Sequence, residues 1–453
     1  MKMKSKILTF IIFALFFSSC ANYVNVNANY EKALIEKKCD EQFFSDNLKK
    51  IKQNDDVIYT GLNVGLIARN CGDFNLSNVF FDAAENAYKY DVDLKSTGKK
   101  AINLIGSTFF DDNILDYDGS LYERIMLNTY KALNFMSLND YENARVEFNR
   151  ALMRQDKAKE YFAKEIEKNR ADLDKAKEDK NYDKNMLENK KDIEEKYNSL
   201  FKEFNTTKEF INPYATYLAS IFFFMDKDYR KAADLFKEVS VIYPKNLSIK
   251  KQAKIFNEYA NKFKIKNEKK YIFVLYENGF SLSIDEFKLP IPFTIDGKII
   301  FSSIALQTLK KNASSYPYLL VNNVKTDEFV NLDDIIATEF KINSPQMITK
   351  ALARAIVKTT INIAVAKNDS DSGLLSFATA LINDANNNAD VRSWRGLAKS
   401  VSVAVLDNKG FITVNDENNN LLFEQEINKN KNVILILRSF APYLPLNTSI
   451  IER

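Results

Sequence analysis

The sequence predicts a mainly helical N-terminal region followed by a C-terminal α+β domain with a mostly antiparallel sheet. Two observations support this prediction. A helix–turn–helix pattern recurs three times before residue 269, and aromatic and β-branched runs separated by Asn, Gly and Pro turns then take over. A third observation, a short apolar run that ends in a cysteine, concerns where the protein resides rather than how it folds.

The N-terminus has the order of a secretory signal peptide. Three lysines precede an apolar run of about eleven residues, which is shorter than the ~20 residues of a spanning helix. Small residues and Cys20 close the run. This ending resembles the lipobox of bacterial lipoproteins, in which cleavage before the cysteine leaves it as the lipidated first residue, although Phe17 stands where the pattern usually has Leu. We expect a signal peptide over residues 1–19, lipidation at Cys20 and a lipidated linker over residues 20–30.

The lipobox predicts a permanent membrane anchor, because each buried CH₂ group of the acyl chains contributes ~0.8 kcal/mol. The alternatives are an ordinary cleaved signal or an uncleaved short anchor. In lipoproteins of enteric-type bacteria, Asp after the cysteine favours retention in the inner membrane. Ala21 therefore predicts the outer membrane, with the protein facing the periplasm.

Composition excludes several classes of function. The chain has 64 Lys and Arg against 60 Asp and Glu, so it has no overall field that would attract nucleic acid. It has no histidine, which removes Ser-His-Asp and Cys-His catalysis and every His-containing zinc site. Residues 96–101 lack the first glycine of a phosphate loop, and the aspartates between residues 111 and 118 lack the last ligand of a calcium loop. We expect no enzymatic activity, no cofactor and no metal.

Two cysteines remain besides the anchor. In the oxidising periplasm Cys39 and Cys71 can form one disulfide, which would stabilise the fold by roughly 3–4 kcal/mol in the chain-entropy model. The alternative is a pair of buried small apolar residues. Sequence alone leaves both open, since it does not place the two Cα atoms.

The stretch from Asn139 to Leu152 resembles the second half of a tetratricopeptide repeat, a unit of two nested helices. An Asp-Tyr pair makes the turn between the helices. A small-large-small pattern then follows at helical spacing, which lets the second helix approach the first closely. The packing residues are Ala144, Phe148 and Ala151, with Ala132 in the small position of the preceding helix.

The same frame recurs after a second Asp-Tyr turn, where Ala232 and Phe236 take the packing positions. A weaker copy lies earlier, with Gly65 in the small position and Phe81 on the packing face. Three copies are the minimum at which such units bury a continuous core. The resemblance therefore implies a divergent tetratricopeptide-like helical solenoid over residues 31–268.

Charged residues fill the outward positions of this frame and an insert within it. We expect Glu147 and Asp234 to face solvent. Residues 154–210 carry two thin apolar seams and predict an inserted antiparallel helical hairpin, with arms of about 25 residues and so about 40 Å. The hairpin is either a solvated spacer or a projecting arm that contacts a partner.

The C-terminal α+β domain is predicted over residues 269–453. Asn278 and Gly279 lie between two strand-like runs and predict a hairpin. Ser344 is placed as the cap of a helix whose first turn contains Pro345. About four strands joined by Asn, Lys and Gly turns follow between residues 400 and 440.

Trp394 lies between two arginines in this region. A stacking platform for sugar or peptide is one reading, and a tryptophan packed under a loop and covered by arginine stems is the one we expect. The stretch "ADVRSWRGLAKSVSVAVL" and Tyr122-Glu123-Arg124 resemble a family of uncharacterised bacterial lipoproteins that joins tetratricopeptide-like helices to a β-rich C-terminal domain. Ala398 stands where that pattern has a proline. The resemblance covers most of the mature chain and implies architecture and compartment, but no catalytic residues.

The function expected from these features is that of a lipid-anchored periplasmic scaffold that binds other cell-envelope proteins through its repeat surface. The family resemblance extends the partners to the peptidoglycan synthesis machinery. The alternative is an enzyme or regulator acting on peptidoglycan through a carboxylic acid, for which Glu123 is the candidate.

Overall fold

Helices make up the first part of the chain, and mostly antiparallel strands dominate the second, as the sequence predicts. The computed structural model contains eleven helices and eleven strands in the part of the chain that it describes. That part comprises residues 23–88, 117–178, 184–207, 211–261, 268–295, 298–368 and 388–453.

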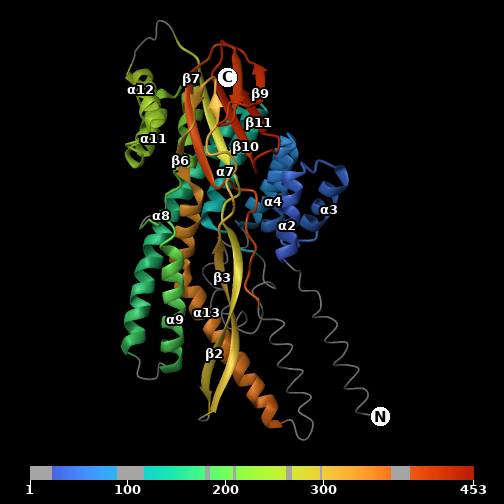
Figure 1. Ribbon diagram of the computed structural model, residues 1–453, viewed down its shortest axis with the longest axis vertical. Helices are drawn as coiled ribbons and strands as arrows, with labels where there is room; N and C mark the ends of the chain where they lie inside the picture. Colours follow the sequence, from blue (N-terminus) through green and yellow to red (C-terminus); the bar gives the residue numbers. More distant parts are fainter. Residues whose placement is uncertain are drawn as a thin grey trace.

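Six of the helices form three consecutive pairs, each joined by a short turn (Figure 1). The pairs are α4 (Val57–Asn70) with α5 (Phe74–Ala87), α7 (Leu121–Ser137) with α8 (Tyr141–Glu178), and α10 (Pro213–Met225) with α11 (Tyr229–Ile242). The first helix of each pair is buried along most of its length, and every residue of α10 is buried.

The three turns between paired helices have the same construction. A residue with positive φ ends the first helix, and the aspartate after it accepts a hydrogen bond from the backbone N–H three residues on, which caps the second helix. The residues with positive φ are Gly72 (82°), Asn139 (60°) and Lys227 (63°), and the capping aspartates are Asp73, Asp140 and Asp228. The helix pairs thus start and stop on local signals.

The remaining helices flank this array. Helices α2 (Tyr23–Ile35) and α3 (Glu41–Lys52) precede it, and α12 (Leu247–Asn261) follows it. Helix α9 (Lys184–Phe201) returns beside the second half of α8, so a helical hairpin is present where the insert was predicted (Figure 1). The insert has no separate start at residue 154, because α8 continues through that point without a break.

The strands form three sheets. A five-stranded sheet has the order β11-β10-β1-β7-β6, in which β1 is parallel to β10 and antiparallel to β7. A smaller sheet has the order β5-β4-β8-β9, and β2 pairs with β3 alone. The strands are β1 (Tyr271–Asn278), β2 (Ser283–Ile295), β3 (Lys298–Lys310), β4 (Leu320–Val321), β5 (Val324–Lys325), β6 (Asp327–Asn331), β7 (Ser400–Asp407), β8 (Phe411–Asn415), β9 (Leu421–Glu426), β10 (Val433–Ser439) and β11 (Asn447–Glu452).

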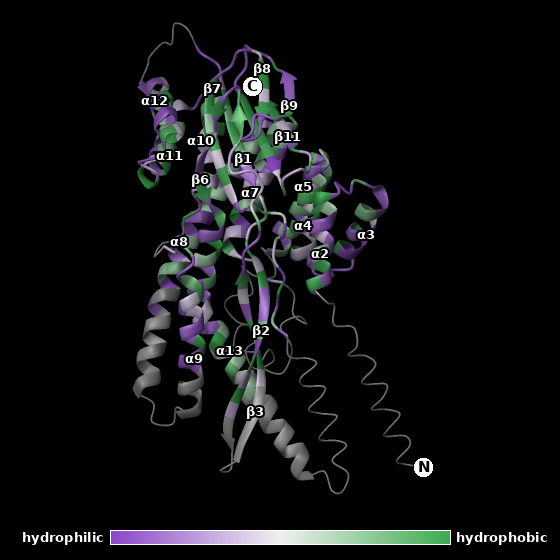
Figure 2. Ribbon diagram, viewed as in Figure 1, coloured by the Kyte–Doolittle hydropathy of each residue, from purple (hydrophilic) through white to green (hydrophobic). Residues whose placement is uncertain are grey.

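Strand β1 shows how the layers are stacked, because all eight of its residues are buried. Successive side chains of a strand point to opposite faces. Phe273 and Leu275 join the core shared with the helices, whereas Ile272 and Val274 join a second core beneath the smaller sheet. The five-stranded sheet therefore lies between the helices and the smaller sheet. In Figure 2 the hydrophobic residues gather in this upper body.

The predicted boundary at residue 268 falls between α12 and β1, where helices give way to strands. The two sides nevertheless share one hydrophobic core. That core contains Leu62, Leu133 and Phe222 from the helical side together with Phe273 and Val401 from the sheet.

Two predictions for the C-terminal region are wrong in detail. Asn278 and Gly279 do not close a hairpin, because β1 pairs with β7 and β10 instead of β2. Strand β2 pairs with β3 along all thirteen of its residues, and only two residues separate Ile295 from its partner Lys298. The chain does turn at Gly279, which has a φ of 59°, but long-range burial determines which strands pair.

The helix expected to be capped by Ser344 is capped thirteen positions earlier. Helix α13 (Leu332–Asn368) is capped by Asn331, whose side chain accepts from the N–H of Asp333. Pro345 lies inside it and has no N–H for the carbonyl of Lys341. The hydroxyl of Ser344 donates to that carbonyl at 2.8 Å, so Ser344 repairs a helix interior instead of capping a start. Helix α13, the β2–β3 hairpin and the α8–α9 hairpin extend away from the upper body (Figure 1).

Candidate functional site

The segment of residues 388–399 forms neither helix nor strand and lies against α2, α4 and α7. Asn27 Nδ2 donates to the carbonyl of Val391 at 2.8 Å. The amide of Asn63 bonds the segment twice, accepting from the N–H of Arg395 at 2.9 Å and donating to the carbonyl of Ser393 at 3.3 Å. Side chains of α2 and α4 therefore hold the backbone of residues 388–399.

Trp394 is the centre of this segment and is 2% exposed. Its ring packs edge-to-face on Phe81 and Tyr130, with centroids 5.6 and 5.7 Å apart. The arginines beside it form ion pairs elsewhere, Arg392 with aspartates and Arg395 with Glu31. Trp394 is thus buried, as expected, but helices cover it instead of arginine stems, and it offers no stacking platform.

Glu123 is buried beneath this segment. Its carboxylate accepts from the N–H of Ser120 at 2.9 Å, from the N–H of Trp394 at 2.7 Å and from the hydroxyl of Tyr117 at 2.8 and 2.9 Å. The first contact completes a capping box at the start of α7. Burial raises the pKa of this carboxyl. Glu123 therefore joins α7 to residues 388–399. Its side chain is fully buried within the described part of the chain.

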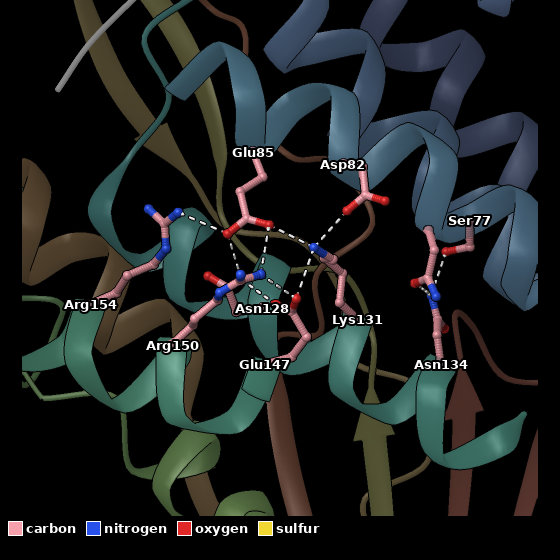
Figure 3. A network of polar contacts seen from close by, with 10 residues as sticks. Ser77, Asp82, Glu85, Asn128, Lys131, Asn134, Glu147, Arg150 and Arg154 are labelled. Carbon is pink, nitrogen blue, oxygen red and sulfur yellow. Dashed lines mark hydrogen bonds and ion pairs between the residues drawn. The ribbon is translucent and has the colours of Figure 1, made fainter. Parts of the chain in front are cut away.

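A buried ionic cluster joins α5, α7 and α8 (Figure 3). The Lys131 ammonium lies 2.6 Å from Glu85, 2.7 Å from Asp82 and 3.1 Å from Glu147. Burial pushes the pKa of Glu85 upward, but Lys131 outweighs it and holds that pKa at about 2. Asn128 bonds to both glutamates, and Arg150 and Arg154 add ion pairs from α8.

This cluster corrects one expectation. Glu147 was placed on the solvent side of the repeat, yet it is 3% exposed because it faces Lys131 on the preceding helix. Asp234 is exposed, as expected. Because anionic and cationic side chains are matched within the cluster, it holds helices together and leaves no unpaired charge for a ligand.

A cavity of about 380 Å³ opens beside residues 388–399. Its walls come from the start of α7, from β2 and β3, from one face of α13 and from residues 389–392. We call it the Glu339 cavity, since the carboxylate of Glu339 lines it while accepting the N–H groups of Leu121 at 2.8 Å and Tyr122 at 3.1 Å. Burial raises the pKa of Glu339 to about 7. A pocket of this size with a perturbed carboxyl is the usual form of a small-molecule site.

The residues assigned to repeat packing are buried among the helices. Phe148 contacts Phe222 of α10 with ring centroids 5.0 Å apart, and Phe236 contacts Phe256 of α12 at 4.5 Å. The four alanines of the frame are at most 1% exposed. They are Ala132, Ala144, Ala151 and Ala232.

Two of the three cysteines lie in the described part of the chain. Cys39 and Cys71 form a disulfide with Cα atoms 5.7 Å apart, which joins the residue before the cap of α3 to the end of α4. Cys20 and residues 96–101 lie outside the described residues, as do the aspartates before Asp118. Over the described ranges no group of three or more Cys, Asp or Glu is arranged to hold a metal.

Sequence reasoning missed Glu339, Lys131 and Glu85. The signal for Glu339 was a single acid within the run "IIATEF", which helical spacing puts on the buried face of α13. Lys131 and Glu85 had no signal of their own, because each looks like an ordinary surface charge until the opposite helix supplies its partner.

No family model matches the chain, and no curated protein or solved structure is significantly similar to it. None of the helices in the described ranges combines the length and the apolar composition needed to cross a membrane. Function is therefore inferred from the chain's own geometry.

Proposed function

We propose that this protein is a lipid-anchored periplasmic scaffold that binds other cell-envelope proteins through a tetratricopeptide-like array. One observation carries the proposal: three helix pairs share the same turn, with a residue of positive φ, a capping aspartate and an aromatic first residue. Repetition of one supersecondary unit is characteristic of binding solenoids.

Residues 388–399 already contact polar side chains of α2 and α4, so we place the partner on the exposed side chains of the array. On the described parts of the three helix pairs, the large hydrophobic side chains that are exposed all lie on the second helices. They are Val79 on α5, Val146, Met153 and Tyr161 on α8, and Val241 and Ile242 on α11. We place the partner on the second helices because exposed apolar surface marks interaction sites.

Photo-crosslinking tests the scaffold proposal. A benzophenone amino acid at Met153, which is 57% exposed, should give a discrete protein adduct in cells. The same probe at Val324, which is 38% exposed on β5, is the matched control away from the array. Adduct formation at Met153 should fall when Val146 is changed to Glu. The same adducts at both positions, or none at Met153, would refute binding through the second helices.

The membrane anchor has its own test. Cys20→Ala should abolish acyl labelling and either release the protein into the soluble periplasm or leave an uncleaved precursor. Acyl labelling that persists in this variant would rule out lipidation at Cys20. Fractionation of inner from outer membranes would test the compartment expected from Ala21.

The alternative, an enzyme or regulator acting on peptidoglycan, no longer has Glu123 as its acid, because that carboxylate serves the capping box and Trp394. The observation that still supports an enzyme is the carboxyl group of Glu339, which lines a cavity and has a pKa of about 7. Loss of a cell-wall cleavage activity in a folded Glu339→Gln variant would favour the enzyme over the scaffold.

A further inference from the structure

The charges that line the Glu339 cavity are unequal. Three carboxyl groups and one guanidinium line it, from Asp118, Glu339, Asp390 and Arg392. The guanidinium is already engaged, because Arg392 bonds Asp390 at 2.9 Å and Asp56 at 2.8 Å. Arg392 is therefore held by other carboxylates and is not the counter-ion of Glu339.

Glu339 is the lining carboxyl that we consider as a ligand contact. It is 5% exposed and forms no ion pair within the described ranges. Each carboxylate oxygen accepts one N–H from the first turn of α7, and a carboxylate has about four acceptor positions, so about two remain for a ligand. The two N–H groups also fix its orientation.

The rest of the wall is aromatic and apolar. Tyr117, Tyr122 and Phe340 line the cavity together with Met347 and Ala351. Aromatic rings beside a carboxylate attract ammonium groups, since the ring faces and the anion both favour a cation that has lost part of its water. A volume of about 380 Å³ suits a molecule of amino-acid or monosaccharide size.

We propose that the Glu339 cavity binds a small soluble organic cation, a primary ammonium compound, with the Glu339 carboxylate as its counter-ion. This site is separate from the outer surface of the helix pairs, so it stands or falls independently of the scaffold proposal. The ammonium group donates to the free acceptor positions of Glu339, and the carbon skeleton lies against Phe340 and Met347.

Calorimetry on the purified full-length protein with a matched pair of probes tests this proposal. Cyclohexylamine and cyclohexanol have the same ring and differ in charge. At pH 8, above the pKa of Glu339, the amine should bind at least tenfold more tightly than the alcohol. Equal affinities, or no measurable binding of either, would overturn the proposal.

Two variants separate charge from shape. Glu339→Gln should remove the preference for the amine, and Ala351→Met should weaken both probes by filling the cavity without changing its charge. Thermal unfolding shows whether each variant is folded, and Ala351→Met keeps the test valid if Glu339→Gln loosens α7. Unchanged amine binding in a folded Glu339→Gln variant, or in Ala351→Met, would place the amine elsewhere on the protein and refute the site.

Discussion

Replacing Lys131 by methionine tests how the second helices are held to the first. Methionine keeps much of the side-chain length and volume but removes the ammonium that lies 2.6 Å from Glu85 and 3.1 Å from Glu147. Both glutamate side chains are only 4% exposed. The change therefore leaves two carboxylates in the helix interface without their central cation (Figure 3).

The magnitude follows from what remains around the two carboxylates. Removing one partner of a buried ion pair costs about 3–5 kcal/mol, because the other charge stays desolvated. Arg150 still lies 2.7 Å from Glu147 and Arg154 3.2 Å from Glu85, so part of the compensation survives. We therefore expect a loss near the lower end, about 3 kcal/mol.

The assay is urea unfolding of the purified full-length protein, with the midpoint and slope compared at neutral pH. Lys32→Met is the matched control, since Lys32 is 68% exposed and forms an i,i+4 pair with Glu36. That pair should contribute less than about 1 kcal/mol. Adding Glu85→Gln to Lys131→Met should recover part of the loss. A Lys131→Met effect as small as that of Lys32→Met would refute the view that the cluster holds the helices together.

Three other predictions concern packing, pH and redox state. Ala144→Leu should lower the free energy of unfolding by about 1–3 kcal/mol, because it overpacks the helix crossing. Asp234→Leu, at an exposed position, should change it by no more than about 0.5 kcal/mol. Equal urea midpoints for the two variants would contradict the repeat frame. Burial raises the pKa of Glu339 from 4.5 to about 7, so the native state binds more protons than the unfolded state in that interval. The free energy of unfolding should fall by up to about 3 kcal/mol as the pH rises from 4.5 to about 7. Glu339→Gln should flatten the dependence of this free energy on pH. The same dependence in the variant would show that other groups cause it. The Cys39→Ala, Cys71→Ala double variant should lose about 3–4 kcal/mol, and thiol trapping of the denatured wild-type protein should find both cysteines oxidised; free alkylation without reductant would disprove the bond.

Local signals were sufficient for the helix pairs and most strands. Asp73, Asp140 and Asp228 each follow a residue that ends a helix, and each caps the next helix through contacts only three residues long. The four strands expected between residues 400 and 440 are present for the same reason, since alternation and turn residues act within a few positions.

Strand partners and helix extent were only partly accessible from sequence. The turn at Gly279 is real, with a φ of 59°, but the chain leaves β1 there instead of folding back on it. Pro345 looked like a helix start because prolines favour the first turn. Pro345 is instead tolerated inside the helix because the hydroxyl of Ser344 donates to the carbonyl of Lys341. Residue preferences for helix positions do not predict this contact.

The sequence by itself determined the order of elements, the three capped turns and the small residues at the helix crossings, because these depend on neighbours within one or two helical turns. Only the tertiary structure decided that Glu147 and Glu123 point inward, that residues 388–399 lie against α4 and α7, and that Glu339 lines a cavity. Each of these depends on partners tens to hundreds of residues away. A charged side chain is stable in the interior only where such a partner is supplied, and one-dimensional patterns do not record which partner that is.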